Sequence, residues 1–453
     1  MSNQSSPLRL GNEKINKLLT EYAIPAIIAM TASSLYNIAD SIFIGHGVGA
    51  LAIAGLAITF PFMNLAAAFG SLVGVGASTV ISVKLGQKDY AGANNVLGNV
   101  FVLNIIIGIA FTLLSFLFLD DVLLFFGASE VTLPYARDYM EIILLGNVIT
   151  HMYLGLNAIL RSSGAPKLAM YATLASVVIN CLLNPIFIFW LGWGIKGSAW
   201  ATVISQVITL TFQFIYFSDS KRFIHFKKGI YKIKMDLVVG IISIGLSPFL
   251  MNLCSCLIVI LINRGLKANG GDLAIGAYGI VNRVVFLFAM IIMGLNQGMQ
   301  PIAGYNFGAR NFGRVTEVTK LTMKIGIGIA TFGFLLCQLL PSVVVRMFTT
   351  DSGLIREAVY GLHIVLAVFP IVGFQMVATN FFLSIGKPFQ AIFLSLTRQL
   401  LFLIPCLLIL PRIWGTFGVW VSIPIADVTA SLVTATVFFQ QLQKFRKIEE
   451  KQM

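Results

Sequence analysis

Twelve long apolar runs, one after another, set the strongest limit on how this 453-residue chain can fold. Each run holds about 20 or more mostly apolar residues, the length that a helix needs to cross roughly 30 Å of lipid hydrocarbon. We therefore predict an all-α polytopic membrane protein with twelve transmembrane helices. Two runs, 51–83 and 273–305, exceed one crossing and should tilt or project beyond the bilayer. The runs fall at 22–44, 51–83, 95–118, 134–160, 168–190, 197–217, 237–263, 273–305, 317–340, 354–385, 389–410 and 416–440.

Composition and charge placement agree with this class. Apolar residues make up 57% of the chain and charged residues 11%, against about 45–50% and 25% in soluble domains. An ordinary soluble enzyme could not cover its surface with so few charges, so we expect no enzyme. The formal charge of +13 sits at the edges of the apolar runs, which argues against a nucleic-acid partner.

The basic residues also predict the orientation in the membrane. If the N-terminus is inside, 22 of the 31 Lys and Arg residues fall in inner segments and 7 in outer ones. Short loops that carry more Lys and Arg stay in the cytoplasm. We therefore expect a multi-pass protein of the plasma (inner) membrane with both termini cytoplasmic.

Three short motifs recur at a constant shift of 222 residues, which indicates that the chain is a duplicated six-helix unit. Because six is even, both copies enter the membrane from the same side and should be related by an axis along the membrane normal. The matching pairs are Leu51–Ile53 with Leu273–Ile275, Leu85–Gln87 with Phe307–Ala309, and Gly164–Pro166 with Gly386–Pro388.

The longest polar connection, residues 218–236, separates the two copies and carries six basic residues. We predict an N-terminal lobe over 1–217, a basic cytoplasmic linker over 218–236 and a C-terminal lobe over 237–453. Alternating-access carriers are commonly built this way, and a receptor or structural scaffold is the alternative. No stretch reads as a Gly-rich phosphate loop followed by Lys and Ser or Thr, so we expect an ion gradient to supply the energy.

Polar residues at matching depth in the first half predict a coupling site. Ionisable groups inside spans are costly and mark function by default. At about 1.5 Å per residue, Asp40 lies about 25 Å up its helix and Asn184 about 24 Å up another. Asn180 lies one turn below Asn184 on the same face, and Thr202 and Tyr139 reach similar heights.

The carboxylate of Asp40 has two ways to act in such a cluster. Loss of water favours its protonated form, whereas carbonyl and hydroxyl oxygens around it would hold a small hard cation, such as Na⁺ bound by Asp40, Asn180 and Thr202. Either change would alter how the first helix packs, and Pro25 interrupts the hydrogen bonding of that helix and provides a hinge. In the alternative reading, neighbouring polar groups satisfy the carboxylate and the two asparagines join helices.

The second half contains a smaller charge network. Arg398 and Asp427 lie at mid-membrane depth on consecutive runs, so they should pair, as a structural bridge or as a direct coupling group. Arg283 either joins this pair or faces a cavity. Flexible thioethers and aromatic rings suit flat apolar cations, although such residues more often serve packing. The candidates for a substrate cavity are Tyr36, Phe286, Met290 and Met293.

Several segments resemble the multidrug and toxic compound extrusion (MATE) family over nearly the whole chain, from about Leu18 to Gln440. The string Gln-Pro followed by Gly-Tyr-Asn-x-Gly-Ala is specific for the family. The segments are Tyr36–Gly45, Leu51–Gly55, Arg161–Gly164, Asn184–Ile188, Gly298–Pro301 and Gly304–Ala309.

The resemblance implies a V-shaped exporter with two six-helix lobes that expels amphipathic organic cations, including drugs, in exchange for H⁺ or Na⁺. The family's first-helix aspartate matches Asp40, and its polar network falls on Asn180, Asn184 and Thr202. Some members have an aspartate at the position of Asn184. Because asparagine is neutral, the site of this chain has less negative charge, which favours H⁺ over Na⁺. We expect a monomer surrounded by membrane lipid, without a cofactor. A lipid-linked precursor flippase of the wider superfamily is the alternative transporter.

Overall fold

The computed structural model describes residues 7–450, without the side chains of residues 35, 37, 38, 50 and 272, and every regular element in that range is helical. Two short π-helical segments, η1 and η2, interrupt the α-helices. The elements are α1 Arg9–Asn12, α2 Ile15–Gly47, α3 Ala50–Gly86, α4 Tyr90–Leu117, α5 Leu119–Phe125, α6 Leu133–Leu145, α7 Asn147–Ser162, α8 Pro166–Pro185, η1 Ile186–Trp190, α9 Gly194–Ser218, α10 Met235–Gly308, α11 Phe312–Leu339, α12 Pro341–Arg346, α13 Ser352–Val365, α14 Phe369–Ser384, α15 Pro388–Leu396, η2 Thr397–Leu403 and α16 Ile404–Glu450.

The expected membrane spans correspond to these helices. By length and composition, the described residues contain 9 helices able to cross a membrane, or 11 if each of two bent pairs counts as one span. One of these, Pro388–Glu450, is 63 residues long, which would measure about 95 Å as a straight helix. Its backbone breaks at Gly415, so this segment provides two spans and not one. With that division, the described residues account for the twelve expected spans.

Both bent pairs lie in runs from which we expected one membrane span each. The run at 134–160 is α6 followed by α7 with a bend of 56°, and the run at 354–385 is α13 followed by α14 with a bend of 55°. Gly146 lies at the first bend, and Pro370 lies in the opening turn of α14. Proline has no N–H to donate and disfavours a helical backbone conformation at the preceding residue, which explains why α13 cannot continue.

The 222-residue repeat is visible in the backbone. Lys88 and Arg310, which are 222 positions apart, are the two non-glycine residues with positive φ in the described chain, at 61° and 58°. Such angles are uncommon outside glycine. In each copy the next residue, Asp89 or Asn311, caps the following helix through its side chain. The duplication inferred from sequence thus extends to matching turns.

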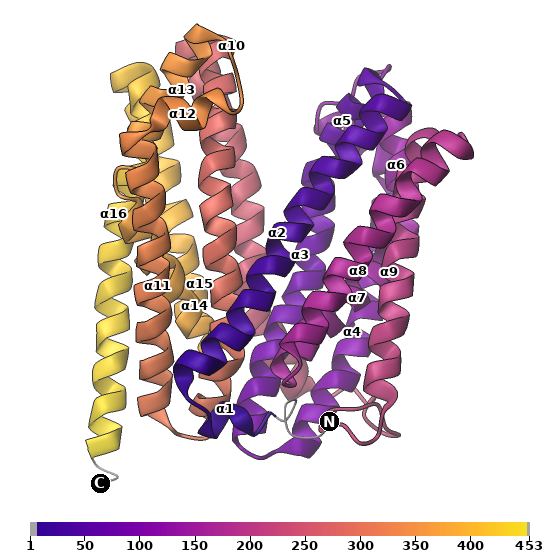
Figure 1. Cartoon of the computed structure of the whole chain (residues 1–453), viewed down its shortest axis with the longest axis vertical. Helices are drawn as coiled ribbons and strands as arrows, with labels where there is room; N and C mark the ends of the chain where they lie inside the picture. The colour runs from indigo at the N-terminus through magenta and orange to yellow at the C-terminus, as the bar shows by residue number, and fades with distance from the viewer. Residues whose placement is uncertain (1–6, 451–453) are drawn as a thin grey trace. The chain divides into compact units, whose positions relative to one another are not determined.

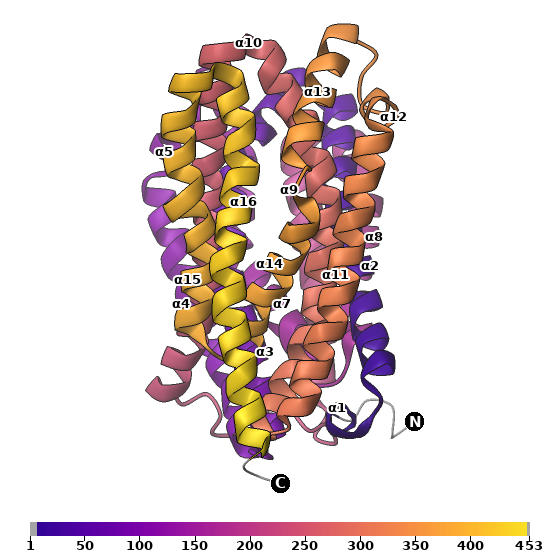
Figure 2. The same cartoon turned by 90° about the vertical axis from the view of Figure 1, so that its left-hand side faces the viewer.

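Contacts divide the chain into two compact units, and neither unit is one continuous stretch. Unit 1 contains the chain up to Asn12 and Ile28–Phe249, and unit 2 contains Glu13–Ile27 and the chain from Leu250 onward. The helices α2 and α10 therefore belong partly to each unit. In unit 1, α3 packs against α4 and α7, and α8 packs against α9 (Figure 1). In unit 2, α14 packs against α11 and α16 (Figure 2).

Close backbone approaches bind the divided helices to their units. A Cβ atom on Gly245 of α10 would lie 1.7 Å from the carbonyl oxygen of Leu72 on α3, in unit 1. A Cβ atom on Gly298 would lie 2.6 Å from the Cα of Ala23 on α2, in unit 2. Residues without a side chain allow helices in membranes to approach this closely. We call these contacts the first and the second glycine seam.

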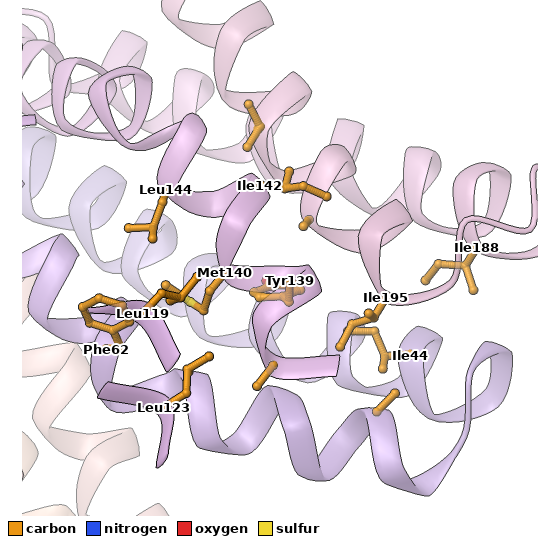
Figure 3. Close-up of a cluster of buried hydrophobic side chains, with 14 residues drawn as sticks. Ile44, Phe62, Leu119, Leu123, Tyr139, Met140, Ile142, Leu144, Ile188 and Ile195 are labelled. Atoms are coloured by element: carbon orange, nitrogen blue, oxygen red, sulfur yellow. The ribbon is translucent and has the colours of Figure 1, made fainter. Parts of the chain in front are cut away.

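One apolar cluster of unit 1 includes Tyr139, a residue of the candidate site. Side chains from α2, α3, α5, α6, η1 and α9 meet there, including Ile44, Phe62, Ile188 and Ile195. Figure 3 shows this cluster, with Tyr139 among its aliphatic members. Because core packing fixes the rotamers of buried side chains, the polar groups next to this cluster are held in place.

Candidate ion-coupling site

Seven polar residues from four helices of unit 1 form one hydrogen-bonded cluster. On three of the helices they come in pairs four residues apart, which places both members on the same helix face. All except Tyr36 are buried. The residues are Tyr36 and Asp40 on α2, Tyr139 on α6, Asn180 and Asn184 on α8, and Ser198 and Thr202 on α9.

The Asp40 carboxylate is the charged group of the cluster, and its side chain is almost fully buried, with 4% of the residue exposed. Ser198 Oγ donates a hydrogen bond to Oδ1, and the Tyr139 hydroxyl donates to Oδ2 at 3.5 Å. The amide of Asn184 lies within reach as well. Within residues 7–450, no Lys, Arg or His forms an ion pair with Asp40. Only neutral donors therefore face this buried carboxylate.

The other members form a chain of hydrogen bonds beside the carboxylate. Asn184 Nδ2 donates to Asn180 Oδ1 at 2.8 Å, and Asn180 Nδ2 donates to Thr202 Oγ1 at 3.2 Å. Thr202 Oγ1 also lies 2.7 Å from the Tyr36 hydroxyl. Each oxygen proposed as a Na⁺ ligand on Asn180 or Thr202 is thus already bonded to a neighbour.

The fit of this site to a metal ion is poor in the observed arrangement. A hard cation takes several oxygen ligands at once. Besides the carboxylate, the described cluster has one buried oxygen without a hydrogen-bond partner, Oδ1 of Asn184. Nowhere in the described residues do three His, Cys, Asp or Glu side chains gather as metal ligands. As the side chains stand, a cation beside the carboxylate would meet one free oxygen, and the remaining ligands would have to come from oxygens that already form hydrogen bonds.

Ser198 is a member of the cluster that was not predicted, and Tyr36, which was expected in a substrate cavity, belongs to the cluster instead. Ser198 precedes Thr202 by four residues and Tyr36 precedes Asp40 by four residues, so the same-face rule that grouped Asn180 with Asn184 would have found both. Pro25 lies within α2 and close to residue 27, after which this helix passes from unit 2 to unit 1. Its role as a hinge stays a prediction.

In unit 2, the expected ion pair between Arg398 and Asp427 is present. Arg398 Nε donates to Asp427 Oδ1 at 2.5 Å, and the side chains are 33% and 3% exposed. Arg283 does not join them, because its side chain is exposed and forms no ion pair with any described residue. Phe286 is exposed on the same helix, whereas Met290 and Met293 are half-buried.

Comparison with known proteins gives a consistent result. The sequence matches the MatE family over residues 25–186 and 243–408. It is 29% identical over 428 residues to the multidrug export protein MepA of Staphylococcus aureus strain N315, which covers 93% of each chain. The structure is similar to that of the MATE multidrug transporter DinF-BH, solved in complex with a ligand, with a TM-score of 0.89, 37% identity and coverage of 97% of this chain and 98% of the other. It also resembles a MATE protein in a bent conformation, with a TM-score of 0.93, 24% identity and coverage of 98% and 99%.

Proposed function

This chain belongs to the MatE family of membrane transporters, and from that premise we propose that it is a secondary active exporter of drug-like organic cations, driven by H⁺ moving inward. Membership confirms the helical membrane fold that the sequence predicted. Ion-coupled antiport is the family's mode of transport, and MepA and DinF-BH are both multidrug transporters. One observation in this chain carries the coupling proposal: the buried carboxylate of Asp40 has neutral hydrogen-bond donors and, among the described residues, no cationic partner.

Proton uptake at Asp40 would change the hydrogen bonding of the cluster. The ionised carboxylate only accepts hydrogen bonds, whereas the protonated acid carries an O–H that must donate. Ser198 and Tyr139 both donate to the carboxylate now, so the new O–H needs an acceptor, which a turned hydroxyl of either residue or the unpartnered Oδ1 of Asn184 can supply. Because these residues lie on helices other than α2, the new bond changes how α2 is held within unit 1. Pro25 would allow the helix to bend in response.

Substrate binding in this proposal uses soft and aromatic side chains. Thioethers adapt to ligands of different shape, and aromatic faces attract cations. Phe286, Met290 and Met293 lie along one stretch of α10 in unit 2 and are not fully buried.

We propose a monomer in the plasma membrane with both termini in the cytoplasm, as the distribution of Lys and Arg favours.

The test is dye efflux from proteoliposomes under separately imposed H⁺ and Na⁺ gradients. We expect the H⁺ gradient alone to drive efflux of a fluorescent aromatic cation, and Asp40→Asn to abolish it. The matched control is Asp121→Asn, because Asp121 is an exposed carboxylate of the same unit and lies outside the hydrogen-bonded cluster. Ser198→Ala keeps the carboxylate but removes one donor and should give intermediate efflux.

Two outcomes would overturn this proposal. Undiminished H⁺-driven efflux by Asp40→Asn would show that the carboxylate does not couple transport. Efflux that needs the Na⁺ gradient and ignores the H⁺ gradient would show that the ion is Na⁺, so that the bonded oxygens of Asn180 and Thr202 must be released to bind it.

A further inference from the structure

The connection between α9 and α10 is an ordered element fixed to α4. Asn94 bonds to it twice: Nδ2 donates to the carbonyl of Phe223 at 3.1 Å, and Oδ1 accepts from the backbone N–H of His225 at 2.9 Å. Asn99 repeats this pattern with residues 232–234, at 3.2 and 2.9 Å. We call residues 219–235 the basic strap.

Apolar anchors hold the strap between these two asparagines. Ile224 and Ile230 are buried, at 1% and 2% exposure. At Gly98 on α4 the strap approaches so closely that a Cβ atom would lie 2.2 Å from the carbonyl oxygen of Ile230. Aromatic rings of Phe101 and Phe226 add an edge-on contact. The strap backbone is therefore fixed, and its outward side chains leave from fixed positions.

The outward face of the strap combines positive charge with exposed apolar groups. Five lysines on it are exposed and form no ion pair with any described residue: Lys221, Lys227, Lys228, Lys232 and Lys234. Between residues 218 and 236 there are six basic and two acidic residues, a net charge of +4. Large apolar side chains alternate with the lysines. They are Phe223 at 40%, Tyr231 at 43%, Ile233 at 51% and Met235 at 68% exposure.

This face lies at the membrane boundary, because the strap begins where the span Gly194–Ser218 ends and finishes where the span from Met235 begins. Aromatic side chains favour the headgroup level of a bilayer, and clusters of 4–8 basic residues next to a span attract anionic lipids. We propose that the basic strap is a docking surface for anionic phospholipid headgroups of the adjacent leaflet. Lysines bind the phosphates, and the apolar side chains enter the interfacial layer.

The mixture of side chains favours a lipid over a soluble anion. Free phosphate would use the lysines alone and would leave the apolar groups in water, whereas a headgroup with its acyl chains covers both. Because Asn94 and Asn99 already fix the backbone, binding costs little ordering entropy.

The experiment measures lipid binding to the purified full-length protein, independently of transport. Native mass spectrometry would compare retained phosphatidylglycerol with retained phosphatidylcholine for three proteins. The strap variant carries Lys227→Gln, Lys228→Gln and Lys232→Gln. The control carries Lys320→Gln, Lys324→Gln and Lys447→Gln, an equal loss of charge from exposed lysines of unit 2. The third is the wild type, with inorganic phosphate added as a soluble competitor.

We expect the preference for phosphatidylglycerol to fall at least roughly tenfold in the strap variant and less than twofold in the control, since each basic residue near a charged surface contributes substantially. Millimolar inorganic phosphate should not displace the lipid. The proposal is wrong if the strap variant keeps the wild-type preference, if both variants lose it equally, or if phosphate competes fully. The melting temperature of each protein shows whether it is folded. If the strap variant is misfolded, the double variant Phe223→Ser with Tyr231→Ser takes its place, and it must also lower the preference for phosphatidylglycerol.

Discussion

The first glycine seam, where α10 crosses α3, allows a sharp test of the packing. In Gly245→Ala the new Cβ would lie 1.7 Å from the oxygen and 2.6 Å from the carbon of the Leu72 carbonyl. These are backbone atoms of a helix and cannot rotate away. A carbon and an oxygen normally stay about 3.3 Å apart, so the two helices would have to separate by roughly 1.5 Å to restore ordinary contact.

The expected cost follows from two opposing effects. Overpacking a close contact costs about 1–3 kcal/mol, and sometimes more, whereas replacing glycine by alanine within a helix gains about 1 kcal/mol. Because the obstructing atoms are backbone, we take the upper end of the cost and expect a net loss of about 2 kcal/mol. In a chain of this length that loss should lower the melting temperature by roughly 2–4 °C.

The matched control is Gly240→Ala, one and a half turns earlier on the same helix. Its new Cβ would meet only Cγ2 of Val80, at 3.9 Å, so it gains helix propensity without a clash. Thermal unfolding of both variants in one detergent, followed by fluorescence-detected size exclusion, provides the comparison. If Gly245→Ala melts at or above the temperature of Gly240→Ala, the close approach does not exist in the protein, and the reasoning on the seams is refuted.

Three further changes have defined outcomes. Asp427→Asn should lower the free energy of unfolding by about 2 kcal/mol, less than the 3–5 kcal/mol expected for a fully buried pair, because Arg398 is partly exposed. A melting curve checks this. The double variant Arg398→Asp with Asp427→Arg should restore part of the lost stability. Lys84 holds the pKa of Asp89 below its usual value. The pair therefore stabilises the fold above about pH 4, and this contribution disappears as the pH falls through the lowered pKa. Asp89→Asn, which keeps the helix cap, should lower the free energy of unfolding by about 0.5 kcal/mol at pH 7 and remove this response to acid. Asn99→Ala should release the strap and increase tryptic cleavage at its lysines, as seen on a gel.

The sequence predicted much of the fold because membrane thickness and duplication are strong constraints. Apolar runs of about 20 residues admit few alternatives to helices, and the offset of 222 reappears in the turns at Lys88 and Arg310. The bends at Gly146 and before Pro370 were not predicted, since a hydropathy pattern does not show where a helix changes direction. The division of α2 and α10 between the units depends on long-range contacts that no local pattern encodes.

The candidate site was predicted in part. Depth and helical phase brought Asp40 together with Tyr139 and Asn184, because both quantities can be calculated from residue numbers. Ser198 was missed because serine is common in membrane helices and attracts no attention without a partner. Whether Arg283 met the pair in unit 2 depended on the rotation of α10, which the sequence does not determine.

The divided helices have a consequence for how such a chain can be cut. Each copy of the repeat contributes the opening turns of its leading helix to the other unit, the same kind of reciprocal exchange that domain swapping makes between protomers. Two polypeptides divided between α9 and α10 should reassemble when expressed together, whereas either one alone would lack a piece of its own bundle.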